Sequence, residues 1–85
     1  MLNRKDFSFL RILHENRCIG YFKSMTMQEI ATEAKTSKSS VYRSFLKLLK
    51  YNMIKKGCLS AKAETYYLTE MGDKVAQNGE YEDYE

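Results

Sequence analysis

The sequence predicts a small, mainly α-helical domain that carries a β-hairpin: an α+β fold of three to four helices and two or three strands. Residues 26–34 and 37–50 each combine a capping residue with apolar side chains at helical spacing. Residues 53–57 and 65–68 are rich in β-branched or aromatic residues, with a short loop between them. These observations place a pair of adjacent helices directly before a hairpin.

Eighty-five residues, 44% of them hydrophobic, are enough for one domain with a core of its own. We expect this domain to span residues 1–77 and an acidic, flexible tail to follow at residues 78–85. No apolar run approaches the roughly 18 residues of a membrane span, and the N-terminus has no signal-peptide pattern. The sequence therefore predicts a cytoplasmic protein that makes no membrane contact.

Residues that commonly carry chemistry are few. His14 is the single histidine, and Cys18 and Cys58 are too far apart in the sequence to match a metal-ligand spacing. We expect no metal and no cofactor, a structural role for His14, and two cysteines that fill apolar space. The chain has no glycine-rich phosphate loop and no paired carboxylates at a plausible pocket, which argues against an enzyme.

The first helix is expected to begin after Asn3 and to continue to about Asn16. The Asn3 side chain can cap it, and Asp6 lies in the first turn, where the helix dipole favours an anion. Its apolar stripe is wide and consists of Phe7, Phe9, Leu10, Ile12 and Leu13. Residues 21–25 are expected to form a short strand before the next helix.

The next two helices are close neighbours in the sequence. Thr26 and Glu29 have the spacing of a capping box, and Ser37 is placed to cap the following helix. Two helices joined by a turn of three to four residues form a helix-turn-helix. Core spacing in the first of them is shown by Met27, Ile30, Ala31 and Ala34. The second has Val41, Phe45, Leu48 and Leu49 on one side and Arg43, Lys47 and Lys50 on the other.

The hairpin and a closing helix complete the predicted domain. The loop at 58–64 joins the two strands and carries Lys62 near its tip. Thr69 is placed to cap a last helix that runs to about residue 77. We expect Met71, Val75 and Ala76 to face the core from this helix.

Charge is distributed unevenly along the chain. Residues 1–63 carry thirteen Lys/Arg and four Asp/Glu, a net charge of +9, whereas residues 64–85 carry one lysine and seven acids, a net charge of −6. Between Lys35 and Ala63 there are eight basic residues and no carboxylate. Ordinary soluble surfaces intersperse both signs, so this window indicates a polyanionic partner, and double-stranded DNA fits a helix-turn-helix.

In order and spacing, the chain resembles the winged helix-turn-helix pattern of bacterial regulators such as the MarR and PadR groups. The residues that carry the resemblance are Gln28-Glu29-Ile30-Ala31, Thr36-Ser37, Ser40-Val41-Tyr42-Arg43, Leu48 and Asn52-Met53-Ile54. It covers roughly residues 5–77 and implies that Ala31 lies where the two helices touch and that Val41 anchors the second one. Lys35 and Asn52 stand where the pattern has glycine; Asn tolerates a left-handed backbone, but Lys tolerates it poorly.

We expect the N-terminal half of the second helix of the pair to enter the major groove, with Arg43 as the first choice for a guanine contact. The expected contacts on that helix are Lys38, Ser39, Ser40, Tyr42, Arg43, Lys47 and Lys50. Those of the preceding helix and the wing are Gln28, Lys55, Lys56 and Lys62. One small domain contacts few phosphates, so we expect a homodimer, with Leu2, Phe9, Ile12 and the closing helix as the candidate interface.

The predicted function is sequence-specific binding of double-stranded DNA, first of all by a transcriptional repressor, the commonest use of such domains. The alternative is a DNA-binding adaptor of a plasmid or phage partition system. The chain resembles the TubR type of adaptor, small winged-helix dimers that bind tandem repeats and hand the DNA to a filament-forming partner.

Other functions fit less well. A winged helix that binds only protein has no need of an acid-free basic window, and single-stranded RNA binders use an exposed stacking platform that is not evident here. The acidic tail is expected to be a solubilising end; a docking peptide for a protein partner or a segment that folds back onto the basic surface are its alternatives.

Overall fold

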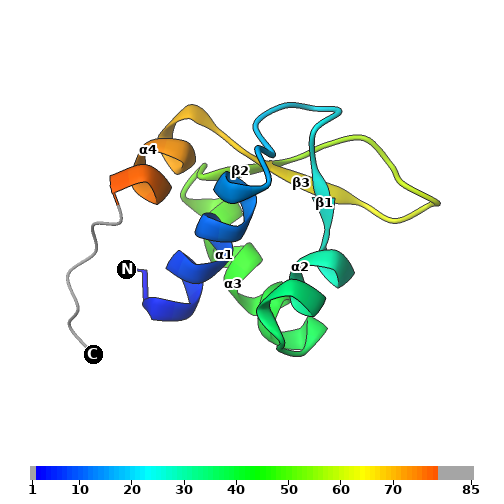
Figure 1. Ribbon diagram of the computed structural model, residues 1–85, viewed down its shortest axis with the longest axis horizontal. Coiled ribbons are helices and arrows are strands. Elements are labelled where there is room, and N and C mark those ends of the chain that lie inside the picture. The colour runs from blue at the N-terminus through cyan, green and yellow to red at the C-terminus, as the bar shows by residue number, and fades with distance from the viewer. Residues whose placement is uncertain (1, 79–85) are drawn as a thin grey trace.

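Four helices and a three-stranded sheet follow one another in the order α1–β1–α2–α3–β2–β3–α4 (Figure 1). The computed structural model describes residues 2–78, so residues 79–85 of the predicted acidic tail lie outside the described residues, whereas residue 78 is the last residue of the final helix. The helices are α1 (Arg4–Glu15), α2 (Met27–Ala34), α3 (Lys38–Lys50) and α4 (Glu70–Asn78). The strands are β1 (Met25–Thr26), β2 (Ile54–Lys56) and β3 (Thr65–Leu68). The predicted winged helix-turn-helix fold is confirmed.

Each helix begins at the cap that the sequence predicts. The side chains of Asn3 and Thr26 accept hydrogen bonds from the N–H groups three residues on, at 2.9 and 3.1 Å, and the acids there bond back to the cap N–H groups. Ser37 accepts from the Ser40 N–H at 3.2 Å, and Thr69 from the Gly72 N–H at 3.1 Å. Because a cap uses only neighbouring residues, it can be recognised without knowledge of the tertiary structure.

Three helices end at a residue with a left-handed backbone. Arg17, Lys35 and Asn52 have φ values of 56°, 56° and 60°. In each case the N–H of the following residue bonds to a carbonyl five residues earlier, at 2.9–3.0 Å, which is the Schellman arrangement. Lys35 thus adopts the conformation that the fold requires, and the helix-turn-helix forms without a glycine in its turn.

The sheet is antiparallel with strand order β1-β3-β2. β3 is central: Met25 pairs with Tyr66 on one side, and Ile54 pairs with Leu68 on the other. The prediction of a strand at residues 21–25 is wrong for residues 21–24, because on this side of the sheet only Met25 and Thr26 pair with β3. Residues 20–23 instead form a tight turn, in which the Lys23 N–H donates to the Gly20 carbonyl at 3.0 Å.

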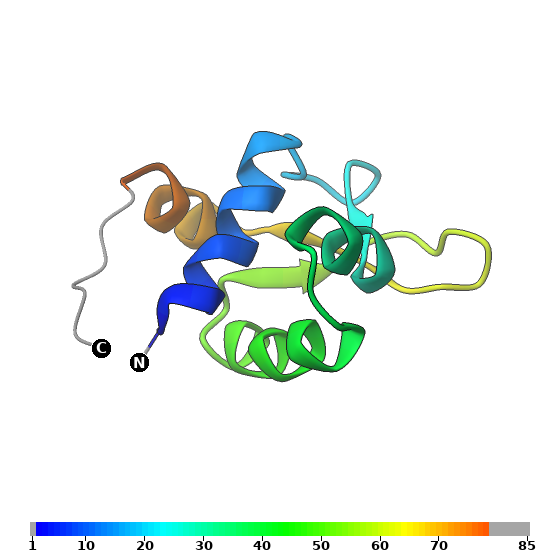
Figure 2. The same cartoon turned by 60° about the horizontal axis from the view of Figure 1, so that its bottom comes forward.

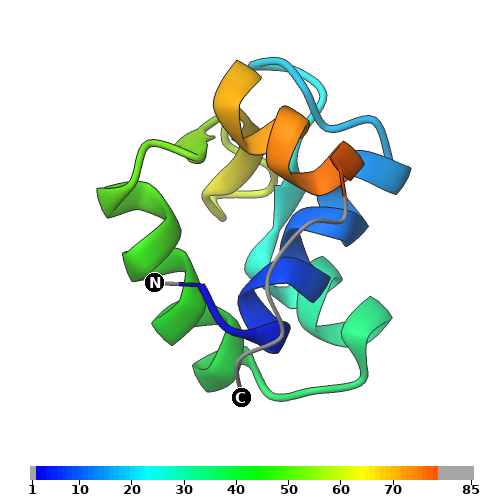
Figure 3. The same ribbon diagram turned by 90° about the vertical axis from the view of Figure 1, so that its left-hand side faces the viewer.

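α1 is the central helix of the core. Figure 3 shows it between α4 above and α2 below, with α3 on the other side of the view. Phe9 is buried and meets Phe45 of α3 edge-on at a centroid distance of 6.3 Å, and Phe45 meets Tyr66 of β3 at 4.9 Å. Ile12 is also buried. The prediction that Phe9 and Ile12 form a dimer surface is therefore wrong, because the protomer's own core uses both, and Leu2 also packs against that core.

α4 packs through a different face from the predicted one. Ala76 is buried and Val75 packs on the core, as expected, but Met71 is 52% exposed. Gly72 faces inward in its place, and a Cβ there would collide with the carbonyl oxygen of Met53. The close approach of α4 to the chain at Met53 therefore sets the rotation of the helix. Among residues 2–78, no helix is long and apolar enough to cross a membrane.

Candidate nucleic-acid interface

α3 presents polar and basic side chains to solvent over most of one face. Lys38, Ser39, Tyr42, Arg43 and Lys50 are exposed. Ser40 is half-buried, and it is engaged with the cap, since its N–H donates to Ser37 and its hydroxyl accepts from the Ser37 hydroxyl at 3.2 Å. Leu46, which the site prediction leaves out, is 51% exposed on the same helix. Its spacing of three residues from Arg43 and four from Lys50 could have placed Leu46 on this exposed face from the sequence.

Contrary to the prediction, Lys47 does not lie on the exposed face of α3. Its Nζ atom donates to Oδ2 of Asp6, a fully buried carboxylate of α1, at 2.7 Å. Asp6 Oδ2 also accepts from the Asn3 N–H at 3.0 Å. A buried carboxylate needs a compensating cation, so Lys47 ties α3 to α1. The two residues are 41 positions apart in the chain, which is why helical spacing alone misplaces Lys47.

The base of the wing is held firmly. The Gly57 N–H donates to the Thr65 carbonyl at 2.8 Å, and the Cys58 N–H donates to the Tyr21 carbonyl at 3.0 Å. The buried Thr65 hydroxyl donates to the Cys58 carbonyl. These bonds join the two arms of the wing to each other and one arm to the loop before β1, so Lys62 beyond them is presented on an ordered hairpin.

The wing ends in a two-residue turn, Ala61-Lys62, closed by reciprocal bonds between Ser60 and Ala63 at 2.8 and 2.9 Å. Both turn residues are left-handed, with φ values of 51° and 70°, as a type I′ turn requires. Lys62 therefore stands at the far end of the wing, as the sequence predicts, and Figure 2 shows the wing extending beyond the helices.

Of the two lysines on β2, one has an acidic neighbour. Lys55 and Lys56 are both exposed, but Lys56 Nζ lies 3.3 Å from Oε2 of Glu64. Both side chains are more than half exposed, so this ion pair contributes little to stability. Glu64 stands one residue beyond the acid-free window, and no local signal points to it.

Glu64 also lines a hollow of ≈240 Å³ between α2, α3 and the wing. The residues around it are Thr26, Met27, Gln28, Lys38, Ala63, Glu64 and Tyr66. The N-terminus of α2 opens into this region, and its free N–H groups and dipole favour an anion. Gln28 and Lys38, both predicted site residues, are thus brought together, with a carboxylate from the wing beside them.

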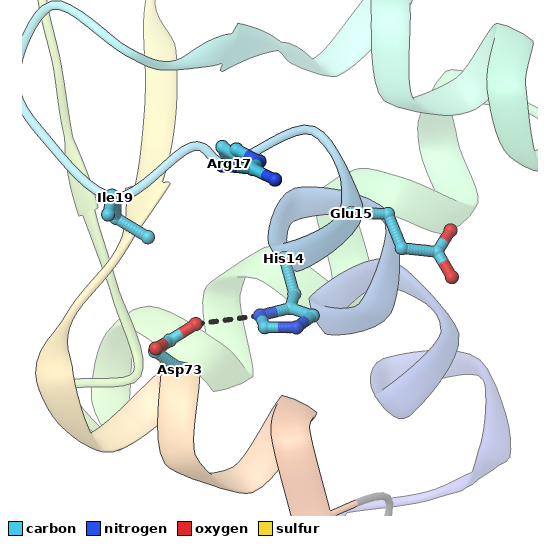
Figure 4. Close-up of a pocket in the computed structure, with 5 residues that line it drawn as sticks. All are labelled: His14, Glu15, Arg17, Ile19 and Asp73. Atoms are coloured by element: carbon cyan, nitrogen blue, oxygen red, sulfur yellow. Dashed lines mark hydrogen bonds and ion pairs between the residues drawn. The ribbon is translucent and has the colours of Figure 1, made fainter.

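A second pocket, of ≈400 Å³, lies where the end of α1 meets α4 (Figure 4). His14 Nδ1 and Asp73 Oδ1 are 2.8 Å apart there, and the pair joins the two helices. This contact gives His14 the structural role that the sequence predicts. No group of three His, Cys, Asp or Glu side chains suited to a metal ion occurs within residues 2–78.

No family model matches the chain. The chain is 34% identical over 71 residues to the DNA-binding protein TubR of Clostridium botulinum C phage, a match that covers 84% of this chain and 88% of that one.

Solved structures give the same result. The chain resembles the DNA-binding TubR fragment from Clostridium botulinum, with a TM-score of 0.75, 30% identity, and coverage of 94% of this chain and 99% of that one. TubR from Bacillus megaterium pBM400 matches with a TM-score of 0.80, 28% identity, and coverage of 94% and 89%.

The transcription regulator MepR of Staphylococcus aureus matches with a TM-score of 0.76 and 16% identity over 88% of this chain and 53% of that one. The chain spans about half the length of MepR, as it does of ZitR from Lactococcus lactis, so these matches show the fold alone. The sequence match extends over nearly the whole of the phage protein, and on that ground the chain belongs to the TubR family of DNA-binding winged-helix proteins.

Proposed function

We propose that this protein binds double-stranded DNA sequence-specifically as a homodimer and serves as the DNA-binding adaptor of a plasmid or phage partition system. The observation that carries the proposal is the exposed basic face of α3 beside a basic wing, in a chain that belongs to the TubR family. The expected contacts follow from geometry: α3 enters the major groove, which is wide enough to admit a helix.

In this arrangement the exposed residues of α3 have different roles. Arg43 reads a guanine, with Lys38, Ser39 and Tyr42 around it, because these side chains lie on the N-terminal half of the helix. Lys50 meets a phosphate further along the helix. Gln28 and the N-terminus of α2 meet another phosphate, and the wing follows the backbone through Lys55 and Lys62. Lys47 has no part in this set, because it is engaged with Asp6.

The partition role is favoured over repression by the relatives. The TubR proteins match over 88–99% of their own lengths, whereas MepR, named as a transcription regulator, matches over about half. Resemblance to the TubR type implies tandem binding repeats and a filament-forming protein partner. A transcriptional repressor is the second candidate, since the fold is shared with MepR and with the transcriptional regulator SlyA.

A homodimer would place two α3 helices about 34 Å apart, one helical turn of DNA. With Phe9 and Ile12 buried in the protomer, the exposed side of α4 around Met71 becomes the candidate interface. Sedimentation equilibrium at high micromolar concentration, with and without DNA, tests this. A monomer under both conditions would contradict the dimer and leave DNA binding itself open to the next experiment.

The decisive experiment is selection of bound fragments from the genome that encodes the protein. We expect enrichment of a region with clustered repeats. Arg43→Ala should still bind DNA but lose preference for the selected repeats, because one bidentate arginine–guanine contact gives about 1–3 kcal/mol of discrimination. Arg11→Ala is the matched control, an exposed arginine of α1 that forms an ion pair with Glu15 of its own helix.

The outcomes separate the candidates. A single site that overlaps a promoter, together with unchanged inheritance of the replicon after deletion of the gene, would favour repression over partition. No enrichment of any fragment would contradict sequence-specific binding. Enrichment that Arg43→Ala leaves unchanged would show that the basic face of α3 is not the reading surface.

A further inference from the structure

The loop between α1 and β1 carries the most exposed large apolar side chain within residues 2–78. Phe22 is 81% exposed, and Tyr21, which meets it edge-on at a centroid distance of 5.0 Å, is 54% exposed. Ile19 of the same loop is also exposed. The bond from the Cys58 N–H to the Tyr21 carbonyl brings the exposed Leu59 of the wing next to this loop. A single exposed apolar side chain needs no explanation, but four in one place indicate a surface that another molecule covers.

A hollow of ≈370 Å³ opens beside Phe22 and carries positive charge. Arg17 and Lys23 line it together with Phe22, and none of the described residues around it is acidic. Both cations are exposed, and neither has an ion-pair partner within residues 2–78. Glu29 and Glu33 line the neighbouring hollow on the side of α2, so the cationic part is confined to the loop. The loop therefore suits a segment that combines aromatic rings with carboxylates.

The segment of the chain that follows α4 has this chemistry. The sequence of residues 79–85 is Gly-Glu-Tyr-Glu-Asp-Tyr-Glu, with four acids and two tyrosines. A second copy of the loop does not fit as well, because it would place Arg17 and Lys23 against the same two cations, and like charges across an interface are unfavourable.

α4 leads residues 79–85 away from the loop of their own chain. Figures 1 and 2 both show α4 running away from the loop before β1 and ending on the other side of the molecule. Seven residues extend over at most about 25 Å, whereas a neighbouring copy can approach the loop directly. We propose that residues 79–85 of one copy bind the loop of a neighbouring copy, with a tyrosine ring against Phe22 and carboxylates at Arg17 and Lys23.

This contact joins different surfaces of the two copies. Such a heterologous contact can continue from copy to copy and produce an open chain or a ring. A segment of seven residues binds weakly when the copies are free, and the contact becomes effective where copies are held close together. Clustered repeats, which the proposed function implies, would hold copies in this way, but the contact itself needs no DNA.

Charge reversal tests the proposal in the absence of DNA. The loop variant carries Arg17→Glu and Lys23→Glu, and the tail variant carries Glu80→Lys and Glu82→Lys. Each variant alone should lose the contact, whereas the reversed tail of one should bind the reversed loop of the other. A contact within one chain cannot produce this result.

NMR follows the amide signals of residues 17–24 in the isotopically labelled loop variant as an unlabelled full-length chain is added. The tail variant should shift these signals saturably. Its affinity should be about tenfold higher than that of the parent chain, because two charge contacts change from repulsive to attractive.

The matched control carries Lys5→Glu and Lys62→Glu, which give it the same net charge as the loop variant and leave the loop unchanged. Both lysines are exposed. The tail variant should shift none of the loop signals of this control. Any attraction that depends only on net charge would affect the control and the loop variant equally.

Phe22→Ala tests the ring contact without a change of charge. In the labelled parent chain, the signals of residues 17–24 should move as the protein concentration rises. Phe22→Ala should weaken this self-contact about tenfold, because one aromatic ring is no longer buried. Phe22 is exposed in the single chain, so its replacement should leave the melting temperature unchanged, which circular dichroism checks.

Three results would overturn the proposal. The tail variant could leave the loop variant's signals unshifted, or it could shift those of the control equally, in which case net charge would be the cause. The loop signals of the parent chain could also be independent of concentration, so that no neighbouring copy occupies the loop. Selection of DNA fragments tests the proposed function separately, so either proposal can fail while the other stands.

Discussion

Asp6 is a carboxylate buried completely in the core, and Lys47 supplies the ammonium that compensates it at 2.7 Å. The other oxygen, Oδ1, has no hydrogen-bond partner among the described residues. We predict that Lys47→Met lowers the free energy of unfolding by about 3 kcal/mol, because an unpaired charge then remains buried. Urea unfolding at neutral pH measures the loss.

Two comparisons isolate the cause. Lys50→Met, on the exposed side of the same helix, should change the free energy of unfolding by less than about 0.5 kcal/mol. The double variant Asp6→Asn, Lys47→Met should recover most of the stability, because no buried charge remains and Asn can still accept or donate near the cap. A double variant as unstable as Lys47→Met alone would mean that packing, rather than charge, dominates this contact.

Cys18 is buried, and this burial, reinforced by Glu29 and Glu33, raises the pKa of its thiol from 9.0 to about 11. The folded state therefore disfavours the thiolate. The contribution of Cys18 to stability is fully present below pH 9 and is lost between about pH 9 and pH 11. We predict that this linkage costs the protein about 2 kcal/mol of unfolding free energy at pH 10.5 relative to neutral pH.

Cys18→Ala provides the reference for that measurement. Burial also raises the pKa of Tyr66, and because both proteins contain Tyr66 its effect cancels in the difference. Urea unfolding in the presence of a reductant should show the parent losing stability faster than Cys18→Ala as the pH rises from 8 to 10.5. Parallel pH profiles would contradict a buried, protonated Cys18.

The helix ends show how the elements are joined without glycine. A left-handed backbone costs a residue with a Cβ atom roughly 1 kcal/mol, and Lys35 has this conformation in the helix-turn-helix. We predict that Lys35→Gly raises the free energy of unfolding by about 0.5–1 kcal/mol, the gain being reduced by the greater freedom of glycine in the unfolded chain. Glu33→Gly, two residues earlier in α2, should instead lower it by about 0.5–1 kcal/mol.

Thermal and urea unfolding of the three proteins check this prediction. Lys35→Gly should leave the selected DNA site unchanged, because glycine preserves the turn that sets the angle between α2 and α3. A loss of stability in Lys35→Gly would mean that the Lys35 side chain makes a stabilising contact that outweighs the relief of strain.

The difference between local contacts and contacts with distant residues explains which features of the helices could be predicted. The caps at Asn3, Thr26, Ser37 and Thr69 depend on residues within three positions, so the sequence alone identified all four. The face of α4 could not be predicted, because it depends on the approach of Gly72 to the Met53 carbonyl. The place of Lys47 depends in the same way on Asp6, 41 residues away. Local chemistry therefore predicts where the helices begin, whereas contacts between distant residues decide which side chains of each helix are buried.

Across the molecule, the basic residues from Lys35 to Lys62 are concentrated in the turn, α3, β2 and the wing, whereas α4 begins with acids in its first turn. This asymmetry orients the domain toward a polyanion before any specific contact forms. Glu64 is the exception. It lies beside Lys56 at 3.3 Å and lines the hollow shared with Gln28 and Lys38, so it opposes phosphate at the place where the wing faces α2 and α3.

Wing variants test this opposition through salt dependence. Each phosphate contact adds about 0.9 to the magnitude of the slope of log Kobs against log salt concentration. Lys55→Ala should therefore weaken binding to all duplexes and reduce the slope by about one unit, whereas Lys23→Ala, in the loop before β1, should not.

Glu64→Gln should strengthen binding to random duplexes more than to the selected site, because it releases Lys56 for a phosphate and removes a repulsive carboxylate. Glu15→Gln, an exposed acid at the end of α1, is its control. Identical slopes for the parent, Lys55→Ala and Glu64→Gln would mean that the wing does not follow the DNA backbone.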